Sequence, residues 1–410
     1  MKKAIICILI CMLMITTTTV IAHPTIRIVE KNLYKNTDGA TGSFVDDSWI
    51  KTFGGLRADA SGSVVQTADG GYIIVGETVS YQSHGYDAWL IKTDSSGNKI
   101  WDKTFGGDLS DAGFSVQQTD DSGYIITGWR DNSVSAFDIW LIKTTDNGNE
   151  EWNKTFDYGG GNDFGFCVRQ TSDGGYILSG HSYDIFGVDS VHLIKTDDKG
   201  NTIWDKKLGE KTFPGYSDSI IETPDHSYVV VGSQLNPQNN SDIWVSKINN
   251  IGELLWEKTY GGNNHDLGFS LVLTNDENYI VVGSTKSSGA ERDDIWLLKI
   301  SNSGDLEQNK TIGGQYFDEK GYSMKLTNDD GYIIAGEKSR QFPRWKYSVG
   351  IIVKLDSDFT TEWTKTFGGI GNSKFLSVQQ TTDNHFILTG DTTRVLNFNR
   401  NAWLVKTIGN

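Results

Sequence analysis

The heptapeptide Trp101-Asp-Lys-Thr-Phe-Gly-Gly107 decides the fold, because the chain spells it again with small changes. WIKTFGG stands at 49–55, WEKTYGG at 256–262 and WTKTFGG at 363–369. A motif that recurs along a chain is typical of repeated structural units, each of which buries its apolar face against the next unit. The heptapeptide therefore indicates scaffold before it indicates an active site.

The aromatic-Lys-Thr unit recurs about every 52 residues and occurs seven times, with Gln in place of Trp in one copy. A lysine and a glycine also recur once in each copy, so three independent series carry the same period. The copies fill the chain from about residue 46 to residue 410, and they start near residues 49, 101, 152, 204, 256, 308 and 363.

Each copy contains four β segments separated by turn signals. In the first full copy we expect strands at 62–67, 72–78, 87–93 and 99–105. No helical period interrupts them. Four short strands in each repeat are typical of a β-propeller blade. The sequence therefore predicts an all-β fold, a seven-bladed β-propeller of four-stranded blades over residues 46–410.

The two ends of the repeat array are complementary. The last copy ends with the third strand of a blade, at 403–407, and a fourth strand without a blade stands at 48–53. We expect this N-terminal strand to complete the last blade, because sheet pairing would then close the ring without leaving a long exposed edge.

The blade pattern, SVQQTDDSGYIITG at 115–128 followed by DIWLIKT at 138–144, resembles WD40 and quinoprotein-type propellers. The full consensus resembles a family of secreted prokaryotic propeller repeat proteins with KTFGG and DGGYI signatures, over roughly residues 46–407. The resemblance implies that the first strand of each blade lines the central channel and the fourth lies at the rim. It also implies that the loops between second and third strands share a face with the connections between blades. It implies almost nothing about activity.

Residues 1–22 have the pattern of a secretory signal peptide, with Lys2 and Lys3 before an apolar core and a small-residue cleavage site before His23. A retained membrane anchor is the alternative interpretation. Residues 23–45 would form an N-terminal extension. We therefore expect a secreted protein, extracellular or at the cell surface, with no stable membrane insertion after signal removal.

The net charge of −15 argues against a nucleic-acid partner. The seven histidines show no metal-ligand spacing, and no phosphate loop or nucleophile elbow occurs. A calcium site in the turns at Asp94, Asp146 or Asp197 would have one or two carboxylates, too few for a loop site. We expect a monomer with no cofactor and no metal.

Eleven of the 13 tryptophans fall on third and fourth strands, at positions that would face a neighbouring blade. We interpret them as packing residues, with sugar stacking as the alternative. The glycine of each second strand is interpreted as the point where an aromatic side chain of the next sheet approaches the backbone.

One slot before the first strand of each blade is acidic in five copies, with Gly215 and Ser373 in the other two. Each acid could simply cap its own turn. Alternatively, the acids could form a partial ring at the channel mouth, for a cation or polyol. They could also supply the carboxylate pair of a glycoside hydrolase, about 5–10 Å apart. The acids are Asp59, Asp111, Asp163, Asp266 and Glu319.

The loops between second and third strands vary in length and content, whereas the other turns are short and uniform. Aromatic residues outside the repeat pattern gather in these loops, and exposed aromatic residues are favoured at binding surfaces. Free drift of the loops is the alternative. The aromatic residues are Trp129, Phe137, Phe186, Trp345 and Tyr347, with the insertion 338–348 as the expected centre.

The leading hypothesis is a secreted, non-catalytic binding or scaffold propeller that recognises a protein or glycan through this loop face. One alternative is a glycoside-acting, endoglucanase-like enzyme that uses the acids at the channel mouth. Another is a purely structural protein of the cell envelope. No catalytic residue is assigned.

Overall fold

The computed structural model describes residues 48–81, 85–132, 136–183, 189–209, 212–215, 219–289, 292–342, 345–369, 371–393 and 399–407. These residues form β-strands and no helix. Accordingly, none of them belongs to a helix long and apolar enough to cross a membrane. The expected signal segment 1–22 and the extension 23–45 lie outside the described residues.

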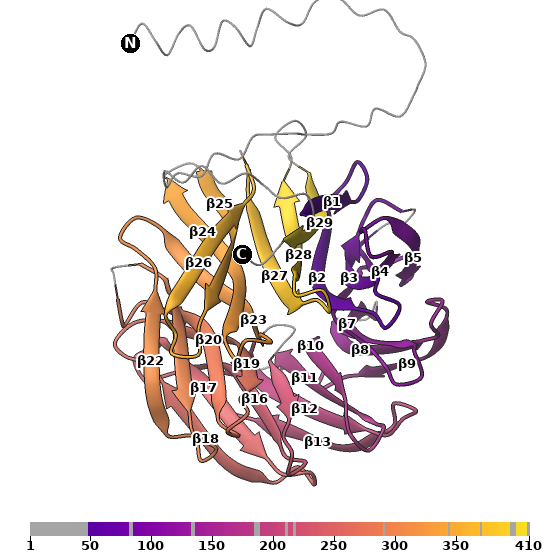
Figure 1. Ribbon diagram of the computed structural model, residues 1–410. Helices are drawn as coiled ribbons and strands as arrows, with labels where there is room; N and C mark the ends of the chain where they lie inside the picture. The colour runs from indigo at the N-terminus through magenta and orange to yellow at the C-terminus, as the bar shows by residue number, and fades with distance from the viewer. Residues whose placement is uncertain are drawn as a thin grey trace, which may run out of the picture. The chain divides into compact units, whose positions relative to one another are not determined.

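The strands form seven antiparallel sheets, the blades of a β-propeller (Figure 1). Blade 1 consists of β2 (Asp59–Gln66), β3 (Tyr72–Thr78), β4 (Asp87–Thr93) and β5 (Lys99–Phe105). Blade 2 consists of β6 (Asp111–Gln118), β7 (Tyr124–Asp131), β8 (Phe137–Thr144) and β9 (Glu150–Phe156). Blade 3 consists of β10 (Asn162–Gln170), β11 (Tyr176–Tyr183), β12 (Asp189–Thr196) and β13 (Thr202–Leu208). Blade 4 consists of β14 (Thr212–Pro214), β15 (Ile220–Glu222), β16 (Tyr228–Leu235), β17 (Ser241–Ile248) and β18 (Leu254–Tyr260). Blade 5 consists of β19 (Asp266–Leu273), β20 (Tyr279–Thr285), β21 (Asp294–Ile300) and β22 (Leu306–Ile312). Blade 6 consists of β23 (Asp318–Leu326), β24 (Tyr332–Phe342), β25 (Trp345–Leu355) and β26 (Thr361–Phe367). Blade 7 consists of β27 (Ser373–Gln380), β28 (Phe386–Thr393), β29 (Arg400–Thr407) and the N-terminal strand β1 (Trp49–Phe53).

The predicted strands at 72–78, 87–93 and 99–105 are confirmed as β3, β4 and β5. The first strand, β2, begins at Asp59, three residues before the expected start, and passes through a β-bulge between Ser61 and Ser63. In blade 4 the first strand is divided into β14 and β15, which both pair with β16. Figure 1 shows β5, β9, β13, β18 and β22 at the rim of the ring, as expected for fourth strands.

The ring closes as the sequence predicted. β1 pairs antiparallel with β29, with Trp49 opposite Lys406 and Phe53 opposite Ala402, and Figure 1 shows the two ends of the described chain side by side in one sheet. Blades 7 and 1 are also joined by side chains, since the Thr382 amide donates to Gln66 Oε1 at 2.9 Å.

The core consists of seven apolar clusters, one between each pair of neighbouring blades. The second and third strands are rich in Val, Ile and Leu and are buried along most of their length, because a sheet stands against each of their faces. No blade could bury this surface alone. The stability of each blade therefore depends on its two neighbours.

The tryptophan of each fourth strand packs on the second-strand aromatic ring of the next blade. Trp101 contacts Tyr124 with ring centroids 6.2 Å apart, and the ring also covers Gly148, in the turn before the fourth strand of that blade. Gly148 has a φ of 71°, so the turn needs glycine both for its backbone and for the space under the ring. The packing interpretation is thus confirmed for these residues: Trp49–Tyr72, Trp101–Tyr124, Trp152–Tyr176, Trp204–Tyr228, Trp256–Tyr279 and Trp363–Phe386.

One junction uses a different arrangement. Between blades 5 and 6 the fourth-strand position is Gln308, and the turn glycine of the next blade is replaced by Phe359. The Phe359 ring is 2% exposed and lies 5.4 Å from the ring of Tyr332. A ring supplied from the turn thus takes the place of the ring normally supplied by the tryptophan. Phe359 adopts a φ of 64°, a strained backbone conformation for a bulky residue.

The prediction for the second-strand glycine was wrong about which neighbouring group leaves no room for a side chain. A Cβ on Gly76 would collide with the carbonyl oxygen of Ala60, in the first strand of the same blade, and not with an aromatic ring of the next sheet. The β-bulge of the first strand brings this carbonyl close to the glycine. The same collision with a first-strand carbonyl occurs at Gly128, Gly283, Gly336 and Gly390.

The recurring lysine of the third strand forms an ion pair that sequence reasoning missed. Lys195 is 2% exposed, and its Nζ lies 2.8 Å from Asp173 Oδ2 and donates to the Thr196 carbonyl. The aspartate belongs to the turn between the first and second strands. The pair is present in every blade: Lys92–Asp69, Lys143–Asp121, Lys195–Asp173, Lys247–Asp225, Lys299–Asp276, Lys354–Asp329 and Lys406–Asp383.

Replacing Asp173 by Asn leaves the buried ammonium group of Lys195 without its carboxylate. We expect a loss of about 1–3 kcal/mol in the free energy of unfolding, below the range for a fully buried pair because Asp173 is half exposed. The double variant Asp173→Asn/Lys195→Met should regain part of that loss, and the exposed Asp198→Asn serves as control. Urea unfolding measures all three. Equal stability of Asp173→Asn and the control would contradict this role.

The ion pairs also predict a loss of stability in acid. Burial alone would raise the pKa of these aspartates, but hydrogen bonds from the lysine, the turn threonine and a turn amide together lower it to about 2 in Asp69, Asp173 and Asp225. A lowered carboxyl pKa contributes stability that is present above the unfolded-state value near 4 and is lost as the pH falls toward 2. We expect the urea midpoint to fall between pH 4 and pH 2. The fall should be shallower in Asp173→Asn/Lys195→Met, and an equal slope in both proteins would contradict the assignment.

Candidate functional site

The five acids of the predicted ring are buried at the junctions between blades, and none is more than 4% exposed. Each of them accepts a hydrogen bond from an amide of the connection that precedes its strand, with Gly314 as the donor to Glu319. Gly55 donates to Asp59 at 2.8 Å, and Gly262 donates to Asp266 at 2.9 Å. The amide donors to Asp111 and Asp163 are Gly107 and Tyr158, at 3.1 and 2.7 Å.

This geometry matches the capping interpretation of the acids. The second carboxylate oxygen of Asp59 accepts from the Thr78 hydroxyl, and Asp266 is held in the same way by Thr285. A general acid or base has to reach a substrate, and a carboxylate enclosed in a blade junction does not. The arrangement therefore offers no support for glycoside cleavage by these residues.

Burial raises the pKa of three of these acids, Asp111, Asp163 and Glu319. Burial, opposed by two backbone hydrogen bonds, raises the pKa of Asp111 to about 6. For Asp163, burial is reinforced by the nearby charges of Asp157 and Asp138 and raises the pKa to about 7. Carboxylate oxygens of Asp138, Asp157 and Asp163 lie within 4.8 Å of one another, so among the described residues these three are placed to hold a metal ion.

The loops between second and third strands share a face with the connections between blades, as the WD40-like pattern implied. The Asp111 amide donates to the carbonyl of Tyr86 at 2.6 Å, and the Glu319 amide donates to the carbonyl of Asp293 at 2.6 Å. Each of these bonds joins the start of a first strand to the preceding blade, at the point where that blade enters its third strand. We call this side of the propeller the loop face.

An aromatic patch lies on the loop face across blades 2, 3 and 4. Trp129 and Phe137, both predicted, lie with ring centroids 4.4 Å apart. Phe164 lies 5.7 Å from Phe137 and 6.5 Å from His181, whose ring is 5.4 Å from Phe213. All five side chains are partly exposed. The aromatic patch is therefore defined as Trp129, Phe137, Phe164, His181 and Phe213.

The aromatic patch continues inward along the first strands. Phe164 lies 6.4 Å from Phe166, which stacks on Phe114 at 5.4 Å with an angle of 6° between the rings. Phe114 and Phe166 are the extra residues of their β-bulges, as are Phe269 and Tyr322 in blades 5 and 6. In blades 2, 3, 5 and 6, the extra residue of the first-strand bulge is thus aromatic.

His181 adds hydrogen-bonding capacity to the aromatic patch. Its Nε2 lies 2.7 Å from Asp189 Oδ1. Burial lowers the pKa of His181, although Asp189 opposes the shift. A neutral imidazole that donates from Nε2 leaves Nδ1 as an acceptor. The aromatic patch can therefore combine ring surface with directed hydrogen bonds.

The opposite side of the loop face is charged. Arg400 pairs with Glu77, and Lys346 Nζ lies 2.6 Å from Glu337 Oε1. Lys374 lies 3.9 Å from Asp391. These side chains come from blades 6, 7 and 1, so the loop face has an aromatic half and a half of ion pairs.

A single repeat slot distinguishes the two halves, and sequence reasoning missed it. The residue after the second-strand glycine is acidic in blades 1, 6 and 7 and of another type in blades 2 to 5, although the glycine before it occurs in all seven copies. An alignment of the seven copies in register would have shown this variation. The slot holds Glu77, Trp129, His181, Ser233, Ser284, Glu337 and Asp391 in blades 1 to 7.

In its described residues, the expected centre at 338–348 is strand and not loop. β24 continues to Phe342 and β25 begins at Trp345, with Phe342 opposite Trp345 and Arg340 opposite Tyr347. Tyr347 is partly exposed, but it belongs to blade 6 and so lies away from blades 2 to 4, which carry the aromatic patch. Phe186 lies outside the described residues.

The sequence matches no protein-family model and no curated protein. Among solved structures, Sqt1 from Chaetomium thermophilum is similar in fold, with 11% identity, a TM-score of 0.50 and coverage of 90% of this chain and 100% of that chain. BBS1N in complex with ARL6DN has 11% identity, a TM-score of 0.50 and coverage of 89% and 96%. The WD40 domain of Neurospora crassa Pan2 has 10% identity, a TM-score of 0.42 and coverage of 73% and 90%. At these identities the likeness to Sqt1 and BBS1N shows the fold alone, and it agrees with the β-propeller that the seven sheets form.

Proposed function

We propose that the protein is a secreted, monomeric and non-catalytic propeller that binds a glycan on the aromatic patch. The observation that carries the proposal is the gathering of five partly exposed rings from three blades on the loop face. Sugar rings have an apolar C–H face and a rim of hydroxyl groups. Aromatic faces suit the first, and the His181–Asp189 pair suits the second.

The size of the aromatic patch favours a glycan over a folded protein. Five rings that are each mostly buried expose on the order of a few hundred Å² in total. A stable protein interface needs about 800 Å² from each partner. A few sugar units match the smaller area.

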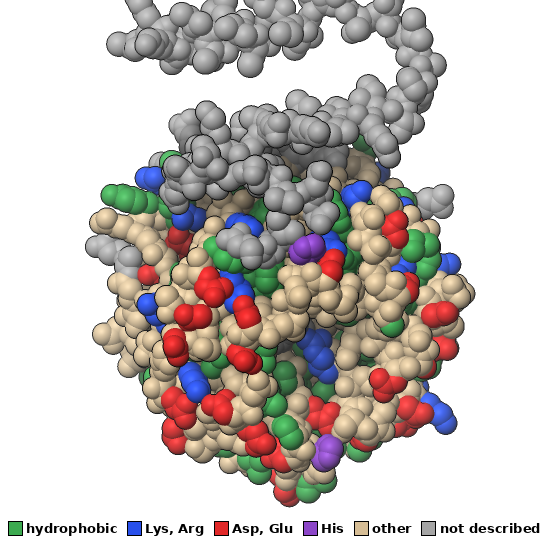
Figure 2. All heavy atoms as spheres, viewed as in Figure 1, with side chains coloured by type: hydrophobic (Ala, Val, Ile, Leu, Met, Phe, Trp, Pro, Cys, Tyr) green, Lys and Arg blue, Asp and Glu red, His purple; other side chains and the backbone are tan. Residues whose placement is uncertain are grey.

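The charge of the chain argues against two other classes of partner. Figure 2 shows Asp and Glu side chains spread over the visible side of the molecule, in line with the net charge of −15. Such a surface repels nucleic acids and anionic membranes. A neutral sugar chain meets no such repulsion. Secretion rests on the signal pattern of residues 1–22.

The test is a panel of neutral oligosaccharides, with the dissociation constant of the best ligand measured by calorimetry. We expect Trp129→Ala and Phe137→Ala each to weaken binding at least about tenfold, since removing an anchoring aromatic residue typically costs about 2 kcal/mol. Trp129→Phe should keep part of the affinity. Thermal unfolding of each variant establishes that the loss is not one of folding.

Two further variants separate this site from its alternatives. Tyr316→Ala, at a ring that is 63% exposed outside the aromatic patch, is the matched control and should bind as the wild type does. Tyr347→Ala tests the hairpin of blade 6. Loss of binding in Tyr347→Ala together with normal binding in Trp129→Ala would overturn the assignment, as would a panel in which no glycan binds.

A further inference from the structure

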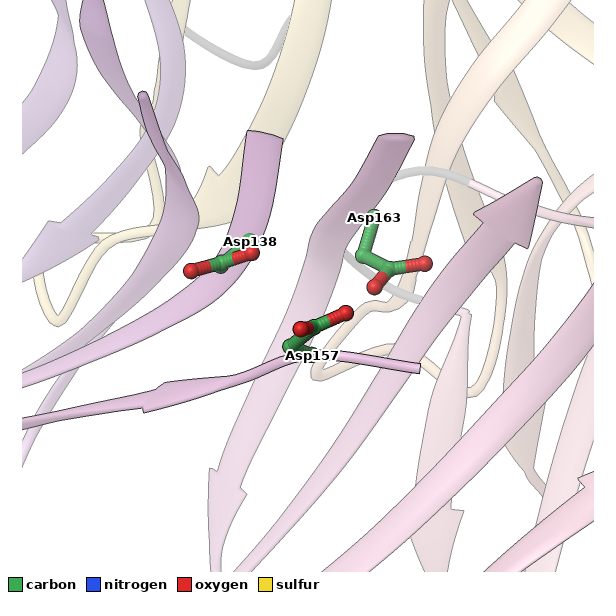
Figure 3. Close-up of side chains that lie close together, drawn as sticks. All are labelled: Asp138, Asp157 and Asp163. Atoms are coloured by element: carbon green, nitrogen blue, oxygen red, sulfur yellow. The ribbon is translucent and has the colours of Figure 1, made fainter. Parts of the chain in front are cut away.

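Three carboxylates meet at the junction between blades 2 and 3, beside the aromatic patch. Asp138 lies on β8, Asp163 lies on β10, and Asp157 lies in the connection between β9 and β10 (Figure 3). One oxygen of each lies within 4.8 Å of the others. Two oxygens bound to the same Ca²⁺ at 2.3–2.6 Å can be at most about 5 Å apart. The spacing therefore fits three ligands of one ion.

One oxygen atom of the group has no hydrogen-bond partner. Asp163 is fully buried, its Oδ2 accepts from the Tyr158 amide at 2.7 Å, and its Oδ1 accepts from no described group. In Asp59 and Asp266 the corresponding oxygen is occupied by a threonine hydroxyl. Blade 3 has Ser182 opposite Asp163, where those blades have threonine. A buried carboxylate oxygen without a partner is costly, so this oxygen is expected to bind something.

The third carboxylate comes from a departure from the repeat. Where other copies read KTFGG, this copy reads KTFDYGG, which places Asp157 at the position of the first glycine. The amides of Gly159 and Gly160 donate to Asp157 Oδ1 at 3.1 Å each and so hold the side chain in place. Asp157 is exposed. An ion could therefore enter from solvent and keep water molecules as its remaining ligands.

The charge of the group is not balanced by protein cations. Within the described part of the chain, the groups that act on Asp138 and Asp163 are neutral hydrogen-bond donors and other carboxylates. By contrast, Glu319, which also has an unpartnered buried oxygen, lies 3.3 Å from Lys338 Nζ. Close carboxylates without a counter-charge bind either a proton or a cation.

We propose that Asp138, Asp157 and Asp163 form a binding site for a divalent cation of the calcium class, which ties the first strand of blade 3 to blade 2. Oxygen-only ligands and the opening to water suit Ca²⁺ better than Mg²⁺, which requires shorter bonds in a strict octahedron. Of the three ligands, only Asp163 was predicted from the sequence as a possible cation ligand, because Asp138 belongs to another blade and Asp157 to a departure from the repeat. The site is independent of the proposed glycan binding.

The experiment is calorimetric titration of the chelator-treated full chain with CaCl₂, and separately with MgCl₂. We expect one Ca²⁺ per chain, with a dissociation constant on the order of 10⁻⁴ to 10⁻³ M, the range of extracellular modules. Asp157→Asn should weaken Ca²⁺ binding at least about tenfold. Because Asp157 is exposed, this change should leave the apo protein folded, as thermal unfolding will establish.

Asp108→Asn is the matched control. It removes the same charge from an exposed position in the corresponding connection of the preceding pair of blades, and it should leave Ca²⁺ binding unchanged. Ca²⁺ should also raise the unfolding temperature of the wild type and of Asp108→Asn, but not that of Asp157→Asn. Absence of Ca²⁺ binding by the wild type up to about 10 mM, ten times the weaker limit of that range, would overturn the proposal. So would equal binding by the two variants.

Discussion

The contact on which the molecule depends is the aromatic ring that each blade places against the next. A four-stranded sheet is apolar on both faces and cannot bury either face alone, so each blade is stable only between two others. Trp101 on Tyr124, and the matching contacts elsewhere, set the distance and angle at which successive sheets meet. Repeated around seven junctions, this geometry produces a closed ring, and β1 completes the last blade because that junction needs the same contact, between Trp49 and Tyr72.

The sequence predicted the repeated part of the fold and not the interactions across it. A regular period identifies strands well, so β3, β4 and β5 were found to the residue. The pairing of Lys195 with Asp173 was missed because the two residues belong to different hairpins of one blade and meet only when the sheet forms. The second-strand glycine was assigned the wrong neighbour for a similar reason, because the β-bulge that brings the Ala60 carbonyl to Gly76 leaves no mark in the period.

The candidate site follows the opposite logic, because it consists of the residues that break the repeat. Trp129 and Phe137 were recognisable as aromatic residues in a variable region, whereas Phe164 and Phe213 stand on first strands and drew no attention. His181 occupies the same slot as Trp129 one blade later. These residues form one surface because the propeller places neighbouring blades side by side. The buried acids, which do repeat, accept hydrogen bonds from amides of the connections between blades.

The claim that an aromatic ring at each junction holds the blades together is tested most directly between blades 5 and 6. There Phe359 supplies the ring, and Gln308 stands in place of the tryptophan. Phe359→Gly removes a buried ring and should cost about 2–4 kcal/mol, and Gln308→Trp alone should not stabilise the protein because Phe359 occupies the space that its ring would fill. The double variant recreates the tryptophan-over-glycine contact of the other junctions, as at Trp256 and Gly304. Urea unfolding should show that the double variant regains most of the loss, with a coupling free energy of at least about 1 kcal/mol. Strictly additive effects of the two substitutions would contradict the account.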